Sequence, residues 1–145
     1  MTRPVPVADE RSTPYWAGAS RHQLVMARCR RCSKYSMPPE HICARCHSTD
    51  PDYVYEAVSG AGAVRSWTVI RQSLLPGLAD EVPFVLVDVE LAEQAGLRLI
   101  GRLLDGPNVP LRMDAPVQVA FEDIREGVSV PAFTLDQRSR EESGR

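Results

Sequence analysis

Apolar and polar residues alternate along much of the second half of the chain, and this period of two predicts β-strands with one buried face. Valine or leucine occupies every second position within 84–91, and leucines alternate with arginines within 97–104. The period returns in 117–122, and 63–71 is rich in β-branched and aromatic residues, which favour strands. The positions expected to face a core are Val85, Val87, Val89, Leu91, Leu97, Leu99, Leu103, Val117, Val119 and Phe121.

Turn-forming residues separate these segments, among them Gly77, Gly96, Gly106 and Gly127. About five strands in about eighty residues must close on themselves to bury one face each, and the five-stranded OB-fold barrel is a common solution at this size. A β-sandwich usually needs about seven strands, which this segment cannot supply. The sequence therefore predicts a mainly β protein whose OB-fold barrel spans 53–134.

A short helix is expected near the N-terminus. Thr13 followed by Pro14 is typical of a helix start, which predicts a helix at 13–23. Tyr15 and Trp16 give this helix an aromatic face. That face packs either on the same chain or on a partner protein, and the sequence leaves both possibilities open.

All four cysteines fall in two C-x-x-C pairs, Cys29 with Cys32 and Cys43 with Cys46. Each pair brings two thiolates together across a tight turn, and two such turns can close a tetrahedral sulfur site of the kind that Zn²⁺ prefers. Residues 24–50 are therefore expected to form a rubredoxin-like zinc ribbon. Four protein ligands fill the coordination sphere, so the zinc is expected to be structural.

Three other roles for these residues compete with a four-cysteine zinc site. Rubredoxin-type iron takes the same four-sulfur geometry and is the nearest competitor. Two disulfides fit less well, because no secretory signal precedes the ribbon. His41 and His47 flank the second pair and could replace a cysteine ligand, although a position outside the ligand set fits the usual ligand count better.

Composition and charge narrow the remaining possibilities. The chain of 145 residues has a net charge of −2, and no apolar run approaches the length of a membrane span. Reduced thiols and the missing export signal lead us to expect a cytoplasmic protein. Residues 1–12 lack periodicity and are expected to be a flexible arm, and the highly charged residues 135–145 are expected to be a disordered tail.

A single-stranded nucleic-acid-binding module is one reading of a zinc ribbon joined to an OB barrel. Five cations and no acid lie between Arg21 and Lys34. Such binding also needs aromatic residues interleaved with cations, and the barrel strands offer only Trp67, Phe84 and Phe121. The acidic segment 80–93 argues further against this function, which is kept as the alternative.

Several local strings resemble a zinc-ribbon/OB-fold family known as domain of unknown function thirty-five. The strings are Tyr15-Trp16 in the helix, the two C-x-x-C pairs with Met37-Pro38-Pro39 between them, Ser48-Thr49, the strand Gly62 to Thr68, the strand start Pro83-Phe84-Val85, and Pro116 to Asp123. The resemblance runs from about Pro14 to Phe133, and its combination of motifs is more specific than any one of them.

The resemblance implies an accessory acyl-CoA-associated subunit. Members of that family are partners of thiolase-fold enzymes, including thiolases and aldolases that act on steroid side-chain CoA thioesters. An assembly with two copies of each chain is the expected arrangement, with the Tyr15-Trp16 helix and the ribbon as docking surfaces. The residues agree, because every cysteine is assigned to metal and none remains as a nucleophile. His22, His41 and His47 show no triad pattern.

Coenzyme A carries phosphate groups that arginine binds well. Arg28, Arg30, Arg31 and Lys34 form the densest cationic cluster and are the first candidates for such contacts. Arg65, Trp67 and Arg71 are candidates to flank a groove between ribbon and barrel that would hold the adenine or pantetheine. The alternative is a solvated cationic face with Trp67 in the core.

Overall fold

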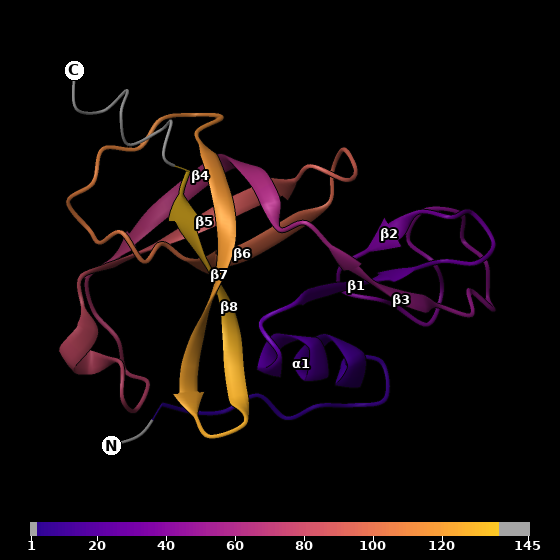
Figure 1. The fold of residues 1–145 in the computed structure, drawn as a ribbon, viewed down its shortest axis with the longest axis horizontal. Helices are drawn as coiled ribbons and strands as arrows, with labels where there is room; N and C mark the ends of the chain where they lie inside the picture. Colours follow the sequence, from indigo (N-terminus) through magenta and orange to yellow (C-terminus); the bar gives the residue numbers. More distant parts are fainter. Residues whose placement is uncertain (1–2, 137–145) are drawn as a thin grey trace.

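The computed structural model describes residues 3–136. Of the tail expected at 135–145, residues 137–145 lie outside this range, whereas Leu135 is the last residue of a strand and is buried. Figure 1 shows a ribbon module at one end and a larger β-barrel at the other. The elements in chain order are α1 (Thr13–Ser20), β1 (Leu24–Arg28), β2 (Tyr35–Ser36), β3 (Val54–Val58), β4 (Ala61–Ile70), the 3-10 helix η1 (Ala79–Glu81), β5 (Phe84–Leu91), β6 (Arg98–Arg102), β7 (Pro116–Arg125) and β8 (Val128–Leu135).

The barrel is a five-stranded antiparallel sheet in the order β6-β5-β4-β7-β8. Its two outer strands approach each other through a parallel bridge between Leu103 and Phe133. The Leu104 N–H donates to the Phe133 carbonyl at 2.9 Å, so the sheet curls into a barrel. Together with α1 and the cysteine cluster, this topology confirms the predicted ribbon and OB-fold.

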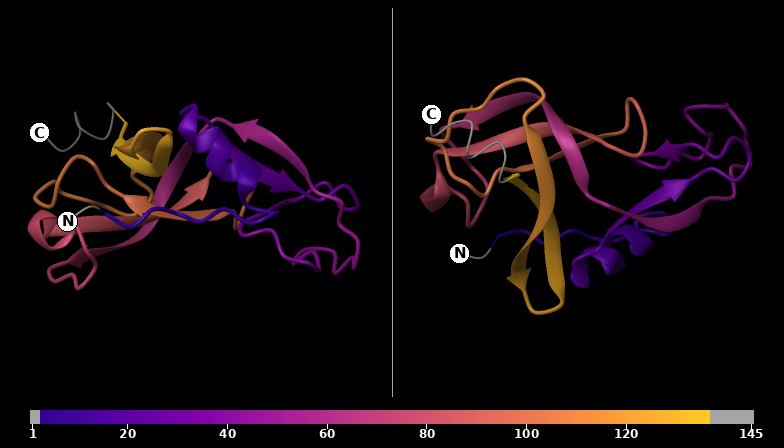
Figure 2. Two further views of the ribbon diagram at one scale, coloured as in Figure 1. Left: turned by 90° about the horizontal axis from the view of Figure 1, so that it is seen from below. Right: turned by 45° about the horizontal axis from the view of Figure 1, so that its top comes forward.

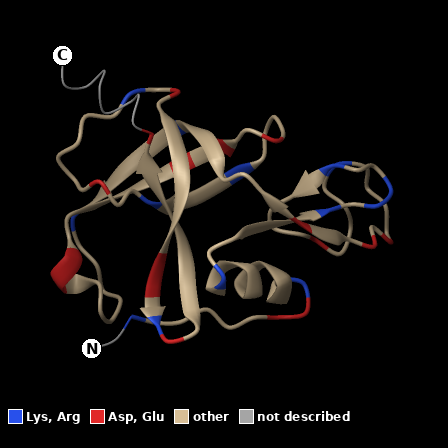
Figure 3. Cartoon of the chain, viewed as in Figure 1, with Lys and Arg blue, Asp and Glu red and all other residues tan. Residues whose placement is uncertain are grey.

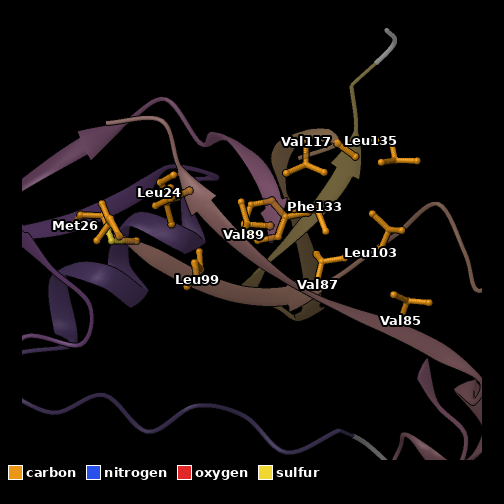
Figure 4. Close-up of a cluster of buried hydrophobic side chains, with 14 residues drawn as sticks. Leu24, Met26, Val85, Val87, Val89, Leu99, Leu103, Val117, Phe133 and Leu135 are labelled. Carbon is orange, nitrogen blue, oxygen red and sulfur yellow. The ribbon is translucent and has the colours of Figure 1, made fainter. Parts of the chain in front are cut away.

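The alternation seen in the sequence sets which side chains enter the core. Val87, Val89 and Leu91 are buried, whereas Asp88 and Glu90, which alternate with them along β5, are half-buried. Leu104 is exposed, but Leu97, Leu99 and Leu103, in and beside β6, are buried in the same way. Figure 4 shows these side chains converging with Phe133, and Leu24 and Met26 of β1 extend the cluster toward the ribbon.

Two members of the predicted core set, Val119 and Phe121, are only half-buried, although both pack against the core cluster. The Phe121 ring also stacks on His22 with 5.2 Å between ring centroids. The physical reason is that β7 pairs with β4 only near its start and then continues with β8 as a hairpin. That hairpin leaves the barrel and packs against α1 (Figure 1).

The ribbon sheet has the order β2-β1-β3. β3 pairs with β1 along its whole length, from Leu24 opposite Val58 to Arg28 opposite Val54. The chain then turns at Gly60, whose φ of +77° and close approach to the Val119 side chain exclude a larger residue. The segment predicted as barrel, 53–134, thus begins with a strand that is hydrogen-bonded to the ribbon.

The helix α1 is shorter than the predicted 13–23. Ser12 occupies the N-cap position in place of Thr13, and the helix ends at Ser20 because the chain turns there, with His22 at a φ of 57°. No helix within residues 3–136 is long and apolar enough to cross a bilayer.

Residues 3–12, which the sequence predicts to be part of a flexible arm, make specific contacts with the rest of the chain. Arg3 forms an ion pair with Glu122 of β7 at 2.7 Å, and the Tyr55 hydroxyl donates to the Arg11 carbonyl at 2.9 Å. Figure 2 shows this segment running beneath the barrel to the helix. Contacts at both ends therefore hold residues 3–12 against the folded part of the chain.

Candidate metal centre and the surfaces around it

The two C-x-x-C turns repeat the same local geometry. In the first, the Ser33 N–H donates to the Cys29 carbonyl and the Cys29 N–H donates to the Lys34 carbonyl. In the second, His47 donates to Cys43, and Cys43 donates to Ser48 in the same way. Ser33 and His47 occupy equivalent positions with φ of 62° and 63°. The two knuckles are therefore local structural duplicates.

The four thiol groups converge on one point. All four Sγ atoms lie within 4.8 Å of one another, and the Cys29–Cys46 and Cys32–Cys43 pairs are each 3.9 Å apart. A tetrahedral zinc with Zn–S bonds of about 2.3 Å requires sulfur separations of roughly 3.8 Å. The observed spacing fits four-sulfur coordination and is much longer than a disulfide bond. Cys29, Cys32, Cys43 and Cys46 thus form a zinc-ribbon site, as predicted.

The surroundings of Cys43 favour its thiolate. Burial acts to raise the pKa of the Cys43 thiol, but hydrogen bonds from the Cys46 and Arg45 N–H groups outweigh it and hold this pKa at about 6. The pKa of Cys46 moves to about 11: its backbone bond from Ser48 lowers it, while burial and the neighbouring thiols raise it more strongly. Without a cation, the negative charge on one thiolate opposes ionisation of the neighbouring thiols. A divalent cation at the centre offsets this repulsion, because it stabilises all four thiolates together.

The ribbon arginines predicted to bind coenzyme A form ion pairs within the ribbon. Figure 3 shows acidic segments of the ribbon in red near the blue knuckle loops. Arg28 lies over the Tyr35 ring. The ion pairs are Arg28–Glu56 at 3.3 Å, Arg30–Asp52 at 3.4 Å and Arg31–Asp50 at 2.8 Å. Within residues 3–136, Lys34 has no carboxylate partner.

Lys34 lines a hollow at the junction of ribbon and barrel. The hollow has a volume of about 440 Å³ and is lined by Cys32, Lys34, Arg45, Gln94 and Ala95. Arg45 donates to the Gly96 carbonyl at 3.3 Å, which fixes its guanidinium beside the β5–β6 turn. Sequence reasoning missed Arg45, although its position inside the second C-x-x-C was a usable signal.

Trp67 does not join the ribbon cations. Figure 1 shows β4 running away from the ribbon. Trp67 lies in the second half of β4, opposite Val87 of β5, and Arg71 follows the last residue of the strand, so the two residues do not line a groove between the two modules. Trp67 is 40% exposed, which also contradicts the alternative of a core tryptophan. Arg65 pairs with Asp114 and, at 3.9 Å, with Glu90. Arg71 is exposed.

Tyr15 and Trp16 pack against each other edge to face, with ring centroids 4.7 Å apart. Burial raises the pKa of the Tyr15 phenol, and Tyr15 contacts the main core cluster. Both rings line an apolar cavity of about 100 Å³ against β1 and Met37. The helix therefore packs on its own ribbon, and the half-buried Trp16 still reaches the surface.

The histidines form no catalytic triad within residues 3–136. His22 Nε2 lies 2.7 Å from Asp123 Oδ1, but the Ser129 hydroxyl donates to the same carboxylate and not to the imidazole. A nucleophilic serine needs the imidazole as its base. His41 lies 3.0 Å from an Arg11 nitrogen, and His47 serves the second knuckle through its backbone.

Fold and site together define a zinc-ribbon/OB-fold protein, and comparison with known families agrees. The rubredoxin-like zinc ribbon domain of ChsH2 matches residues 16–52, and the C-terminal OB-fold domain of ChsH2 matches residues 55–122. These two adjoining domains span most of the chain. The chain belongs to the zinc-ribbon/OB-fold family that they define.

Solved structures and a curated relative extend this likeness. A chain of the Ltp2-ChsH2(DUF35) aldolase superposes with a TM-score of 0.76 and 26% identity, covering 90% of this chain and 98% of that chain. A DUF35 protein of unknown function from Sulfolobus solfataricus shares the fold, with a TM-score of 0.57, 14% identity, and coverage of 89% and 87%. The probable enoyl-CoA hydratase alpha subunit of Thermomonospora curvata is 30% identical over 131 residues, which are 90% of this chain and 39% of that protein.

Proposed function

We propose that this chain is an accessory subunit of an enzyme that acts on acyl-CoA thioesters, and that it has no catalytic activity alone. The observation that carries the proposal is the superposition on nearly the whole ChsH2(DUF35) chain of an aldolase named for two proteins. The relative named as a probable hydratase alpha subunit supports the same class of substrate.

The cysteine chemistry agrees with an accessory role. Enzymes of the thiolase class use a free thiolate as nucleophile, but all four cysteines of this chain lie in the metal cluster. Closed four-sulfur coordination leaves zinc no open position at which to activate water. The partner subunit therefore supplies the groups that break bonds, and this chain contributes shape and binding surface.

In more detail, the proposed partner is a thiolase-fold aldolase or thiolase, joined as two copies of each chain, with a steroid side-chain thioester as its substrate. A coenzyme A phosphate contacts this chain at the ribbon–barrel hollow. Lys34 and Arg45 are the candidates there, because neither has a carboxylate partner among the described residues. The other ribbon arginines are already engaged with Glu56, Asp52 and Asp50.

Affinity purification of the tagged chain from the organism that encodes it tests the proposal. We expect an enzyme of acyl-CoA metabolism to co-purify in stoichiometric amount, and the reconstituted pair to turn over an acyl-CoA that neither chain converts alone. Binding of single-stranded DNA with a steep salt dependence, and no such enzyme, would favour the nucleic-acid alternative.

A paired variant set tests the coenzyme A contact within that complex. Replacing Lys34 and Arg45 by alanine is expected to raise KM for the acyl-CoA at least about tenfold, since charge-assisted phosphate contacts are strong. Replacing Arg30 and Arg31 by serine changes the net charge equally and is the matched control. Equal effects of the two pairs, or no effect of either, would contradict a contact at the hollow.

A further inference from the structure

The far half of β4 is an open sheet edge. β4 pairs with β7 only through Ala61 to Ala63, and Val64 then exchanges backbone hydrogen bonds with Asp114 and Ala115. From Ser66 to Ile70, every strand pair within residues 3–136 is made with β5. One side of this segment therefore presents backbone N–H and C=O groups without a strand partner.

Exposure of the side chains supports the same conclusion. Ser66, Trp67 and Thr68 are all exposed, although consecutive strand residues point to opposite faces. A strand in the middle of a barrel sheet would show at least one of them buried. Trp67 is the largest of these side chains, and aromatic residues of this size are enriched at the centres of protein interfaces.

The positions of the charged residues along β4 indicate whether a second copy of the chain could pair with this open edge. Antiparallel pairing of two β4 edges about Thr68 would place Arg65 of each copy opposite Arg71 of the other, since each lies three residues from the centre. Like charges directly opposite one another destabilise a strand pair. Arg65 is paired with Asp114, but Arg71 has no carboxylate partner within residues 3–136, so self-pairing would bring an arginine and no acidic group to Arg71.

From this geometry we infer that Ser66 to Ile70 receives an extended segment of the partner enzyme subunit as an added strand. Trp67 is the apolar anchor, and an acidic residue of the added segment faces Arg71. Strand addition supplies main-chain hydrogen bonds along the edge, and the side chains give it specificity. The inference rests on the proposed function, because the added segment belongs to the partner enzyme.

Three variants of the full chain, each reconstituted with the co-purified partner, test the inference. Trp67→Ala removes the anchor and is expected to raise Kd for the partner at least about tenfold, as loss of a central aromatic does at interfaces. Thr68→Lys puts a charge on the edge and is expected to weaken binding similarly. Ile100→Lys adds the same charge at an exposed position of β6 and is expected to leave Kd unchanged.

Hydrogen exchange provides a second readout that does not depend on substitution. In the complex, the backbone amides of Ser66 to Ile70 are expected to exchange at least about tenfold more slowly than in the free chain. A stable complex with no added protection there, and with Trp67→Ala at wild-type affinity, would overturn this inference and leave the proposed function intact. Absence of any acyl-CoA enzyme partner would overturn both. A homodimer that Thr68→Lys dissociates would identify a second copy as the occupant and refute the inference.

Discussion

Gln94 binds both main-chain groups of Tyr35 with a single side chain. Its Oε1 accepts the Tyr35 N–H at 2.8 Å, and its Nε2 donates to the Tyr35 carbonyl at 2.9 Å. The Gln94 amide thus pairs with the backbone of β2 in the way that a residue of a neighbouring strand would. Since Gln94 lies in the β5–β6 turn, this pair of bonds fastens the zinc ribbon to the barrel.

Replacing Gln94 by alanine is expected to lower the free energy of unfolding by about 1–3 kcal/mol, the range for two partly buried hydrogen bonds. Urea denaturation followed by circular dichroism measures the change. Gln72→Ala removes an exposed amide from the β4–β5 loop and is the matched control. An equal loss in the control would show that the Tyr35 contact carries no stability.

Metal removal is expected to unfold the ribbon, because a four-cysteine zinc site supplies much of the folding free energy of a small module. Mass spectrometry should find one zinc per chain, and Cys43→Ser should abolish it. A coloured protein that contains iron would contradict zinc. Wild-type thermal stability after complete chelation would contradict the structural role of the metal.

His47 is expected to tolerate glycine but not valine. Its φ of 63° is strained for any side chain and most strained for a β-branched one, so His47→Val should cost about 1–2 kcal/mol. His47→Gly should keep full zinc content, because the imidazole is not among the four ligands. Zinc loss in the glycine variant would show that the imidazole helps to bind the metal.

Gly101→Ala is expected to lower stability by about 1–3 kcal/mol through overpacking. A Cβ at this position would lie 2.9 Å from the Phe133 ring, at the point where β6 meets β8. The second substitution Phe133→Leu should make the alanine less costly than it is in the wild-type background. Additive effects of the two changes would show that the ring does not limit this position.

Stability is expected to fall in acid partly through Asp123. A hydrogen bond from Ser129, and then one from His22, lowers the pKa of the Asp123 carboxyl below its ordinary 3.8. A carboxyl with a depressed pKa stabilises the fold above its ordinary pKa, and this contribution is lost as pH falls through the lowered value. Asp123→Asn should therefore flatten the stability curve below about pH 4, measured by urea denaturation. An unchanged curve in this variant would contradict the prediction.

The sequence predicted those features that depend on neighbours along the chain. Period-two patterning placed Val85, Val87 and Val89 in the core, and the C-x-x-C spacing identified the metal ligands. It could not predict the charge balance of the ribbon. The partners of Arg30 and Arg31 lie about twenty residues further along, and only the fold brings Asp52 and Asp50 beside them.

The exposure of Trp67 was also beyond sequence reasoning. Its strand has the composition of a buried one, and the open edge arises because β7 turns away from β4 after three residue pairs. Likewise, the sequence could not decide whether Tyr15 packs on its own chain or on a partner protein, because that depends on tertiary contacts. The structure shows that ring against the core cluster, while the docking role of the helix stays a prediction.

Helix α1 lies in the angle between the ribbon and the β7–β8 hairpin, in contact with strands of both. The helix packs on both the ribbon and the β7–β8 hairpin, so a change in the angle between these two parts would break its packing contacts. A protein held in one shape loses little conformational entropy on association. The short helix thereby favours assembly even where it touches no other molecule.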